Sequence, residues 1–199
     1  MKLQYSPNSP YVRKVVMLAH ELGLNDRIER EPLTLSPYEP NAAVTALNPL
    51  GKIPVLVTDE EESLFDSIVI CEYLAALAGD RQWFPEPGPK RWNALRANAV
   101  ADGMLEAAQL MRFESSRPET ARYDKWSDAQ SGKVLRGFEF LERNLPANDD
   151  IGAIAVASTI GWLDFRFPTL QWRTKAPRLA AWFADFERRD SVSATRHPA

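Results

Sequence analysis

The sequence has one cysteine and two histidines among its 199 residues, and this scarcity limits the chemistry that it can carry. Cys71 has no second cysteine with which to form an intramolecular disulfide. Only His20 and His197 accompany it, so no metal-ligand spacing can be assembled, and we predict no metal site. A chain without disulfides fits a reducing compartment, and we expect a cytoplasmic protein.

Excess positive charge and long apolar runs are also missing. Lys and Arg number 24 against 27 Asp and Glu, and they are spread along the chain, so no basic surface for nucleic acid is expected. The longest apolar run, Ile151 to Ile160, is too short to span a bilayer and predicts a buried helix. No signal peptide is recognised near the start, where Lys2 to Tyr5 lead into a proline-rich turn. We therefore expect neither a nucleic-acid nor a membrane partner.

Prolines divide the chain into two parts. The segment from Gly79 to Pro89 has three prolines in its last five residues and cannot continue a helix. Before it, short strand-like segments alternate with helical patterns, which predicts an α/β domain over residues 1–79. After it only helical patterns follow, which predicts an all-helical domain over residues 90–199.

Local signals place the elements within each part. Strands are expected at 2–5, 27–32, 55–58 and 63–65, and the last two should form a hairpin around the acidic turn 59–62. A helix should begin at Ser9 or Pro10 and end at Gly23, and another should open at Asp66-Ser67 with Cys71 packed in its interior. The second half predicts helices at 91–114, 123–145, 151–167 and 176–189.

Three separated segments carry the functional signal: 6–15, 48–56 and 65–70. Each has a purely structural explanation when taken alone. Ser9 and Asp66-Ser67 are good helix caps, and Asn48-Pro49-Leu50-Gly51 is a good turn.

Taken together, in this order and spacing, the segments resemble the glutathione S-transferase family. That family shows a Ser, Tyr or Cys at the first helix, then N-P-x-G-K-[IV]-P-x-L, then [ED]-S before the third helix. The resemblance continues through Ala101-Asp102-Gly103, 112–114 and 163–168, so it covers essentially the whole chain. It implies a thioredoxin-like N-terminal domain, an all-α C-terminal helical bundle, and glutathione as co-substrate.

The resemblance also implies roles for particular residues. Asp66 and Ser67, at a helix start, would hold the γ-glutamyl carboxylate and the neighbouring ammonium. Ile53 and Pro54 match the family's cis-proline turn, which offers backbone to the cysteinyl residue of the ligand, and Lys52 would face the glycyl carboxylate. A solvated turn lysine is the structural alternative for Lys52.

Ser9 is the expected thiol-activating hydroxyl, because Val12, Arg13 and Lys14 follow it as in the serine-type motif of the family. Ser6 and Tyr5 remain rivals, since other branches place the hydroxyl slightly earlier.

The helical domain is expected to contribute the site for a small apolar electrophile. Candidates on the two relevant helices are apolar residues, which could equally be core: Met104, Ala108, Met111, Phe113 and Trp162. One departure from the family is Ala153, which cannot complete a capping box with Asp150, so the stability of that helix is in doubt.

The resemblance further implies a homodimer in which Asp102 reaches the ammonium of the neighbouring subunit's ligand, although an ordinary polar helix position explains Asp102 equally well. The predicted activity is glutathione conjugation in detoxification. Two alternatives stay open: a glutathione-dependent isomerase or dehalogenase, and a non-catalytic binding or regulatory protein with the same fold.

Overall fold

The computed structural model describes residues 1–198 and divides the chain into two compact units. The first contains Met1–Pro85 together with the chain from Arg189 onward, and the second is Glu86–Arg188. The division between the units, at Pro85 and Glu86, lies in the segment between the helix that ends at Leu77 and the helix that starts at Pro89.

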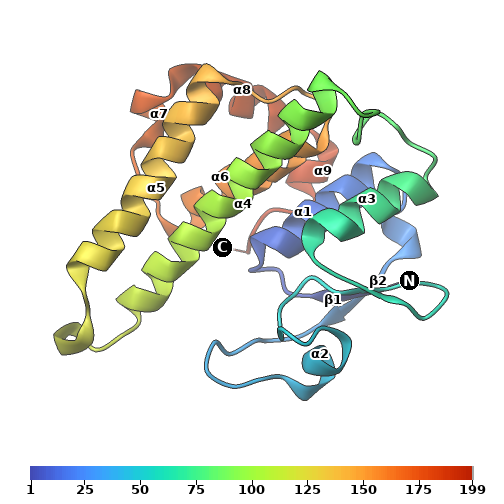
Figure 1. The fold of residues 1–199 in the computed structure, drawn as a ribbon, viewed down its shortest axis with the longest axis horizontal. Coiled ribbons are helices and arrows are strands. Elements are labelled where there is room, and N and C mark those ends of the chain that lie inside the picture. Colours follow the sequence, from blue (N-terminus) through green and yellow to red (C-terminus); the bar gives the residue numbers. More distant parts are fainter. Residues whose placement is uncertain (199) are drawn as a thin grey trace. The chain divides into compact units, whose positions relative to one another are not determined.

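The first unit is built on a four-stranded mixed sheet of order β2-β1-β3-β4. Its strands are β1 (Lys2–Tyr5), β2 (Glu29–Pro32), β3 (Leu56–Val57) and β4 (Ser63–Leu64). β1 and β2 are parallel, whereas β3 pairs antiparallel with both β1 and β4. In Figure 1, α1 and α3 lie on one side of β1 and β2, and α2 lies on the other. This arrangement confirms the thioredoxin-like fold.

The helices of the first unit begin at side-chain caps. α1 (Pro10–Glu21) starts after Ser9 with proline in its first turn, and α3 (Ser67–Leu77) starts after Asp66, both as predicted. Gly23 lies just past α1 with a φ of 66°, the left-handed conformation in which glycine is favoured. α2 (Ala42–Leu47), capped by Asn41, and the 3₁₀ turn Asn25–Arg27 were not predicted.

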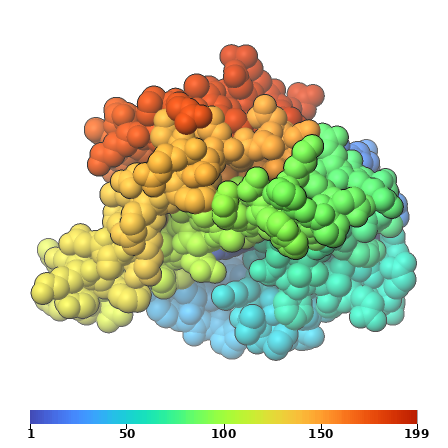
Figure 2. Space-filling model, turned by 45° about the horizontal axis from the view of Figure 1, so that its top comes forward, coloured from blue at the N-terminus to red at the C-terminus, as the bar shows by residue number. Residues whose placement is uncertain are grey.

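The second unit consists of helices, which confirms the predicted helical domain class. They are α4 (Pro89–Ser115), α5 (Asp124–Arg143), α6 (Ile151–Arg166), α7 (Trp172–Lys175) and α8 (Pro177–Phe186), with a 3₁₀ turn at Glu119–Ala121. α4 packs against both α5 and α6, and the connection from α4 to α5 forms a protruding tip, yellow in Figure 2. Every residue from 151 to 160 is buried, so the apolar run of the sequence is the core helix that was expected.

The last segment, including α9 (Asp190–Ser193), belongs to the first unit and packs against α1. Arg189 forms an ion pair with Glu21 at 2.9 Å, and Ser191 donates to the same carboxylate at 2.5 Å. Arg13 donates to the carbonyl of Val192 at 3.4 Å. These contacts, and not local sequence, decide where the segment lies.

Candidate functional site

Ser9 caps the N-terminus of α1. Its backbone is extended, and its Oγ accepts a hydrogen bond from the backbone N–H of Val12 at 3.3 Å. That bond uses a lone pair of the hydroxyl and leaves its proton available. A capping serine can therefore still donate a hydrogen bond to an anion placed at the helix start, where the helix dipole favours negative charge.

A small cavity of about 40 Å3 opens beside Ser9. Tyr5 and Ser6 line the same cavity, so all three candidate residues border it. The other lining residues are Pro7, Val12, Arg13, Val16, Arg30, Ala194, Thr195 and Arg196. The cavity has room for a small chemical group and not for a tripeptide.

The segment 48–54 is shaped by Asn48, which is only 2% exposed. Its side-chain amide donates to the carbonyl of Lys52 at 2.9 Å, and its Oδ1 accepts from the N–H of Leu50 at 3.0 Å. Gly51 has a φ of 63°, a conformation that side chains rarely adopt. Asn48 and Gly51 thus fold the loop, which explains why both types occur in the motif.

This loop delivers Lys52, Ile53 and Pro54. The Ile53–Pro54 peptide bond is cis, as the resemblance implied. Lys52 is exposed, and its ammonium forms no ion pair with any residue from 1 to 198. Over the same described range, the backbone N–H and C=O of Ile53 make no hydrogen bond. The loop therefore presents one cation and one unused strand-like backbone.

The start of α3 is similarly open. Asp66 caps the helix through a bond from the N–H of Ile68 to its Oδ1 at 3.2 Å, which leaves the other carboxylate oxygen available at an exposed position. Ser67 is 2% exposed, yet neither its hydroxyl nor its N–H bonds to another part of the described chain. These are the donors that a carboxylate would need.

Strand pairing places the segments near Ser9 and Pro54 at one edge of the sheet. β1 and β3 run antiparallel, and the N–H of Gln4 donates to the carbonyl of Val55 at 2.9 Å. If this register is continued by one residue along each strand, Tyr5 lies opposite Pro54. The chain from β1 to Ser9 and the cis-proline turn therefore leave the sheet side by side.

The pairing of β3 with β4 places the start of α3 near the same turn. Leu56 of β3 lies opposite Leu64 of β4, and two residues further Pro54 is level with Asp66. Ile53 is then level with Ser67. The three predicted segments converge at this edge, although Ser9 and Ile53 are 44 positions apart in the sequence.

Asp102 belongs to the other unit, on α4, where its Oδ2 accepts from the side chain of Asn98 at 2.9 Å. Among the electrophile candidates, Met104, Ala108 and Trp162 are buried, as core residues would be, whereas Met111 and Phe113 are half-buried.

The absence of a capping box does not leave α6 uncapped. Asp150 accepts from the N–H of Ala153 at 3.1 Å. Its burial raises the pKa of its carboxyl, an effect that the N–H groups of Ala153 and Gly152 partly offset.

Sequence reasoning missed the residues from 194 to 196 that line the cavity beside Ser9. No local motif marks them, because their position follows from the contacts of the last segment with α1. Arg30, at 5.4 Å from the ring centroid of Tyr5, was also missed, because its position near Tyr5 follows from the pairing of β2 with β1.

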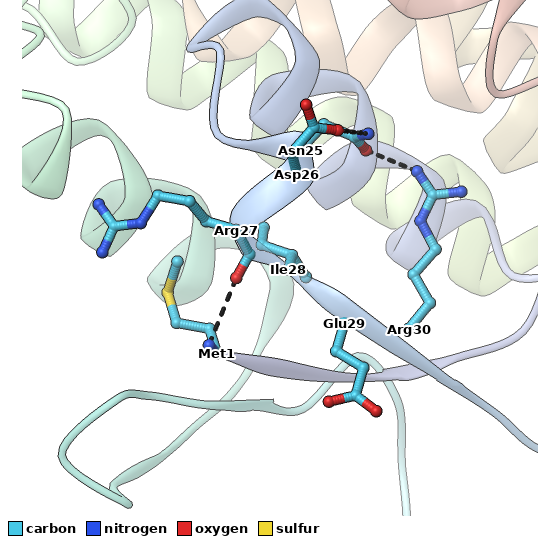
Figure 3. Close-up of a pocket in the computed structure, with 7 residues that line it drawn as sticks. All are labelled: Met1, Asn25, Asp26, Arg27, Ile28, Glu29 and Arg30. Carbon is cyan, nitrogen blue, oxygen red and sulfur yellow. Dashed lines mark hydrogen bonds between the residues drawn. The ribbon is translucent and has the colours of Figure 1, made fainter.

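A second hollow, of about 650 Å3, lies at the opposite end of β1 and is drawn in Figure 3. Its polar groups are already engaged: the amino group of Met1 with Asp59 at 2.7 Å, and Arg30 with Asn25 at 2.6 Å. It is open, and none of the predicted site residues lines it. We assign no function to it.

Within residues 1–198, no helix is both long and apolar enough to cross a membrane, and no three His, Cys, Asp or Glu side chains gather as a metal site would require.

Comparisons with known proteins agree with this geometry. Residues 8–77 match the family described as "Glutathione S-transferase, N-terminal domain", and residues 124–185 match "Glutathione S-transferase, C-terminal domain". The chain is 31% identical to the uncharacterized GST-like protein YibF of Escherichia coli K12, over all of this chain and 99% of that protein.

Solved structures are similar over the full length. A glutathione transferase family member from Pseudomonas fluorescens Pf-5, with bound glutathione, has 41% identity and a TM-score of 0.95, over 100% of this chain and 99% of that one. A glutathione S-transferase from Methylobacillus flagellatus, with glutathione bound, has 33% identity and a TM-score of 0.87, over 99% of both chains. The chain therefore belongs to the glutathione S-transferase family.

Proposed function

We propose that this protein is a glutathione transferase that adds the thiolate of glutathione to small apolar electrophiles. The observation that carries the proposal is the convergence at one sheet edge of the starts of α1 and α3 with the Ile53–Pro54 turn, all with unused hydrogen-bonding groups. The Pseudomonas and Methylobacillus relatives, which hold glutathione, support glutathione as its co-substrate.

Each part of glutathione has a counterpart in the proposed site. The γ-glutamyl carboxylate would accept from the N–H and hydroxyl of Ser67, and the ammonium would pair with Asp66. The cysteinyl backbone would bond to Ile53 as an added strand does. Lys52 would attract the glycyl carboxylate from an exposed position.

Ser9 would stabilise the thiolate by donating its hydroxyl proton to the sulfur. Lowering a thiol pKa from about 8.5 to about 6.5 requires roughly 2.7 kcal/mol. A helix N-terminus supplies up to about 2 kcal/mol and a hydrogen bond to a charged group about 1.5 to 3 kcal/mol. These two contributions are sufficient without a general base.

The reaction then needs no covalent enzyme intermediate. In a substitution, the sulfur forms a bond to the electrophilic carbon, and the leaving group departs with the electron pair of its own bond. In an addition to an activated alkene, the alkene π electrons move to the neighbouring carbon, which takes a proton from water. The protein contributes thiolate stabilisation and orientation.

The helical domain, residues 90–199 in the sequence-based division, would contribute residues that bind the electrophile. Met111 and Phe113 are the better candidates of the predicted set, because both are partly exposed. A homodimer acting in the cytoplasm, in detoxification, completes the proposal.

Calorimetric titration with glutathione tests the binding step, and a panel of electrophiles assayed with glutathione tests the chemistry. Ser67→Ala should weaken glutathione binding, whereas Ser63→Ala, on β4 outside the helix start, should leave it unchanged. Absence of both binding heat and thermal stabilisation at millimolar glutathione would refute the proposal, since a ligand of the native state must raise the melting temperature.

A further inference from the structure

The neighbouring helices α4 and α6 of the helical unit each have an arginine in their last turn. α4 and α6 lie side by side in Figure 1, and their contacts fix the register. A Cβ at Gly152 would meet the carbonyl of Ala94 at 2.7 Å, and the hydroxyl of Thr159 donates to the carbonyl of Ala101 at 3.3 Å. Both residue numbers increase together, so the two helices run in the same direction.

Seven residues beyond the Thr159–Ala101 contact, Arg166 is level with Ala108. Arg112 follows one turn later on the same face of α4, after the buried residues Leu105 and Ala108. The row of buried residues on α4 is thus followed by Arg112, and Arg166 lies in the last turn of α6.

Neither arginine is neutralised by a carboxylate. Among residues 1–198, the side chains of Arg112 and Arg166 form no ion pair and no hydrogen bond, and Nε of Arg166 is buried without a partner. Burial, and after it the charge of Arg112, lowers the pKa of Arg166. Arg112 is exposed, whereas Arg166 is half-buried with an unpartnered Nε, and a bound anion would reduce the repulsion between the two charges.

The carboxylates in the same region are already committed. Asp164 binds Arg173 at 2.6 Å and also accepts from the indole of Trp172. Glu114 accepts from the backbone N–H of Tyr123 at 2.8 Å and lies 3.7 Å from Arg117. Asp164 and Glu114 are therefore not available as counter-ions for the two arginines.

Aromatic side chains adjoin the pair. The guanidinium of Arg166 lies 4.1 Å from the ring centroid of Phe165, and Trp162 contacts Phe167 edge to face at 6.1 Å. Phe165 and Phe167 are half-buried, so they offer partly exposed apolar surface on either side of Arg166 in the sequence. The set combines a place for a negative charge with a place for an apolar body.

We propose that Arg112 and Arg166 form an anion-binding site that holds a carboxylate on the electrophilic co-substrate. This inference rests on the proposed function and narrows it, because the electrophile becomes an apolar molecule that carries a carboxylate. The structural alternative is that both arginines only complement their helix dipoles, since each lies in the last turn of its helix.

Arg143 separates these explanations, because it is also a last-turn arginine, at the end of α5 in the same unit. The probes are 3-nitrobenzoate and 3-nitrobenzamide, which share an apolar ring and differ in the charge of one group. Binding of both is measured by calorimetry in the wild type, Arg112→Gln, Arg166→Gln and Arg143→Gln, with glutathione titrated against each protein.

The wild type should bind the carboxylate about ten-fold or more tightly than the amide, as expected for a hydrogen bond to a charged group. Arg112→Gln and Arg166→Gln should each lose most of that preference, and Arg143→Gln should keep it. Thermal melts should show the first two variants folded, because each removes one member of a repelling pair.

The preference for the carboxylate over the amide is then measured in catalysis, as the ratio of the kcat/KM values for 4-chloro-3-nitrobenzoate and 4-chloro-3-nitrobenzamide with glutathione. No carboxylate preference in the wild type, an equal preference in all four proteins, or its loss in Arg143→Gln would overturn the proposal. Failure of glutathione itself to bind would instead refute the proposed function and leave the nitrobenzoate result to stand by itself.

Discussion

The N-termini of α1 and α6 are capped in the same way but have different surroundings. Ser9 accepts from Val12 at 3.3 Å beside an open cavity, and Asp150 accepts from Ala153 at 3.1 Å while only 8% exposed. Both satisfy one free N–H of a first turn. The difference is that the capping oxygen of Ser9 borders a cavity, whereas that of Asp150 is enclosed.

The largest effect is expected at the N-terminus of α6, where Gly152 packs closely against α4. Gly152→Ala would bring a methyl group to 2.7 Å from both the carbonyl of Ala94 and the Cβ of Ala97. Because backbone must move, we expect a loss of about 1 to 3 kcal/mol or more in the free energy of unfolding. Denaturant unfolding measures it.

Gly103→Ala is the matched control, since it is also a helical glycine but a Cβ there meets nothing within 4 Å. It should stabilise by roughly 0.4 to 1 kcal/mol. Equal effects of the two substitutions would contradict the close packing of α6 on α4.

The next largest effect is expected at the N-terminus of α1, where Ser9 borders the cavity. Ser9→Ala should raise the pKa of the bound glutathione thiol by roughly one to two, because a hydrogen bond worth about 1.5 to 3 kcal/mol to the anion is lost. Conjugation near neutral pH should fall accordingly. Ultraviolet titration of the enzyme-bound thiolate measures the change.

Because Ser9 also caps α1, a loss of about 1 kcal/mol in folding stability is expected in any case and does not discriminate. Ser6→Ala and Tyr5→Phe are the controls, since both residues line the same cavity. A shift of thiol pKa in either control, with none in Ser9→Ala, would transfer the role to that residue.

A smaller effect is expected at Asp150. Asp150→Asn keeps an acceptor for the helix, whereas Asp150→Ala removes it, so the alanine variant should be less stable than the asparagine variant by about 1 kcal/mol. Equal unfolding free energies would mean that the cap contributes nothing.

The pH dependence of the wild type against Asp150→Asn has a defined sign. Burial raises the pKa of Asp150 in the folded protein above 3.8, so ionisation costs stability at neutral pH and this cost disappears as pH falls towards 3.8. Wild type should therefore gain stability relative to Asp150→Asn on acidification. A loss instead would mean that the folded protein lowers this pKa.

The smallest expected effect extends the comparison to α4. If Asp102 contributes a charge to the ligand ammonium of a neighbouring subunit, Asp102→Asn should weaken glutathione binding by about 0.2 to 1 kcal/mol. Light scattering should give a mass twice that of the chain. A monomer at micromolar concentration would contradict the assembly, and unchanged affinity would contradict only the role of Asp102.

Sequence patterns predicted those elements that are long or carry strong caps. α1 and α3 were placed by Ser9, Gly23 and Asp66, and α6 by its apolar run. α2, α7 and α9 have four to six residues each, too few to repeat a helical period, and were missed.

The site was predictable only in parts. The motif around Lys52 and the pair Asp66-Ser67 indicated ligand chemistry, but their common location depends on a strand register that no single segment encodes. The cavity beside Ser9 also needs Thr195, which Arg13 meets at 3.4 Å across 182 residues of sequence. Long-range contacts of this kind leave no periodic or compositional signal.

The return of the chain from Arg189 to the first unit makes the helical unit an insertion in topological terms, since the polypeptide leaves the first unit near Pro85 and re-enters it near Arg189. A chimera that exchanges the helical unit between relatives therefore needs two junctions. A single crossover in the linker would join α1 to a foreign terminal segment and replace Arg189 and Ser191, the partners of Glu21. By the same topology, one proteolytic cut in the linker leaves the helical unit covalently attached only to the segment from Arg189, which holds the rest of the first unit through non-covalent contacts such as those with Glu21.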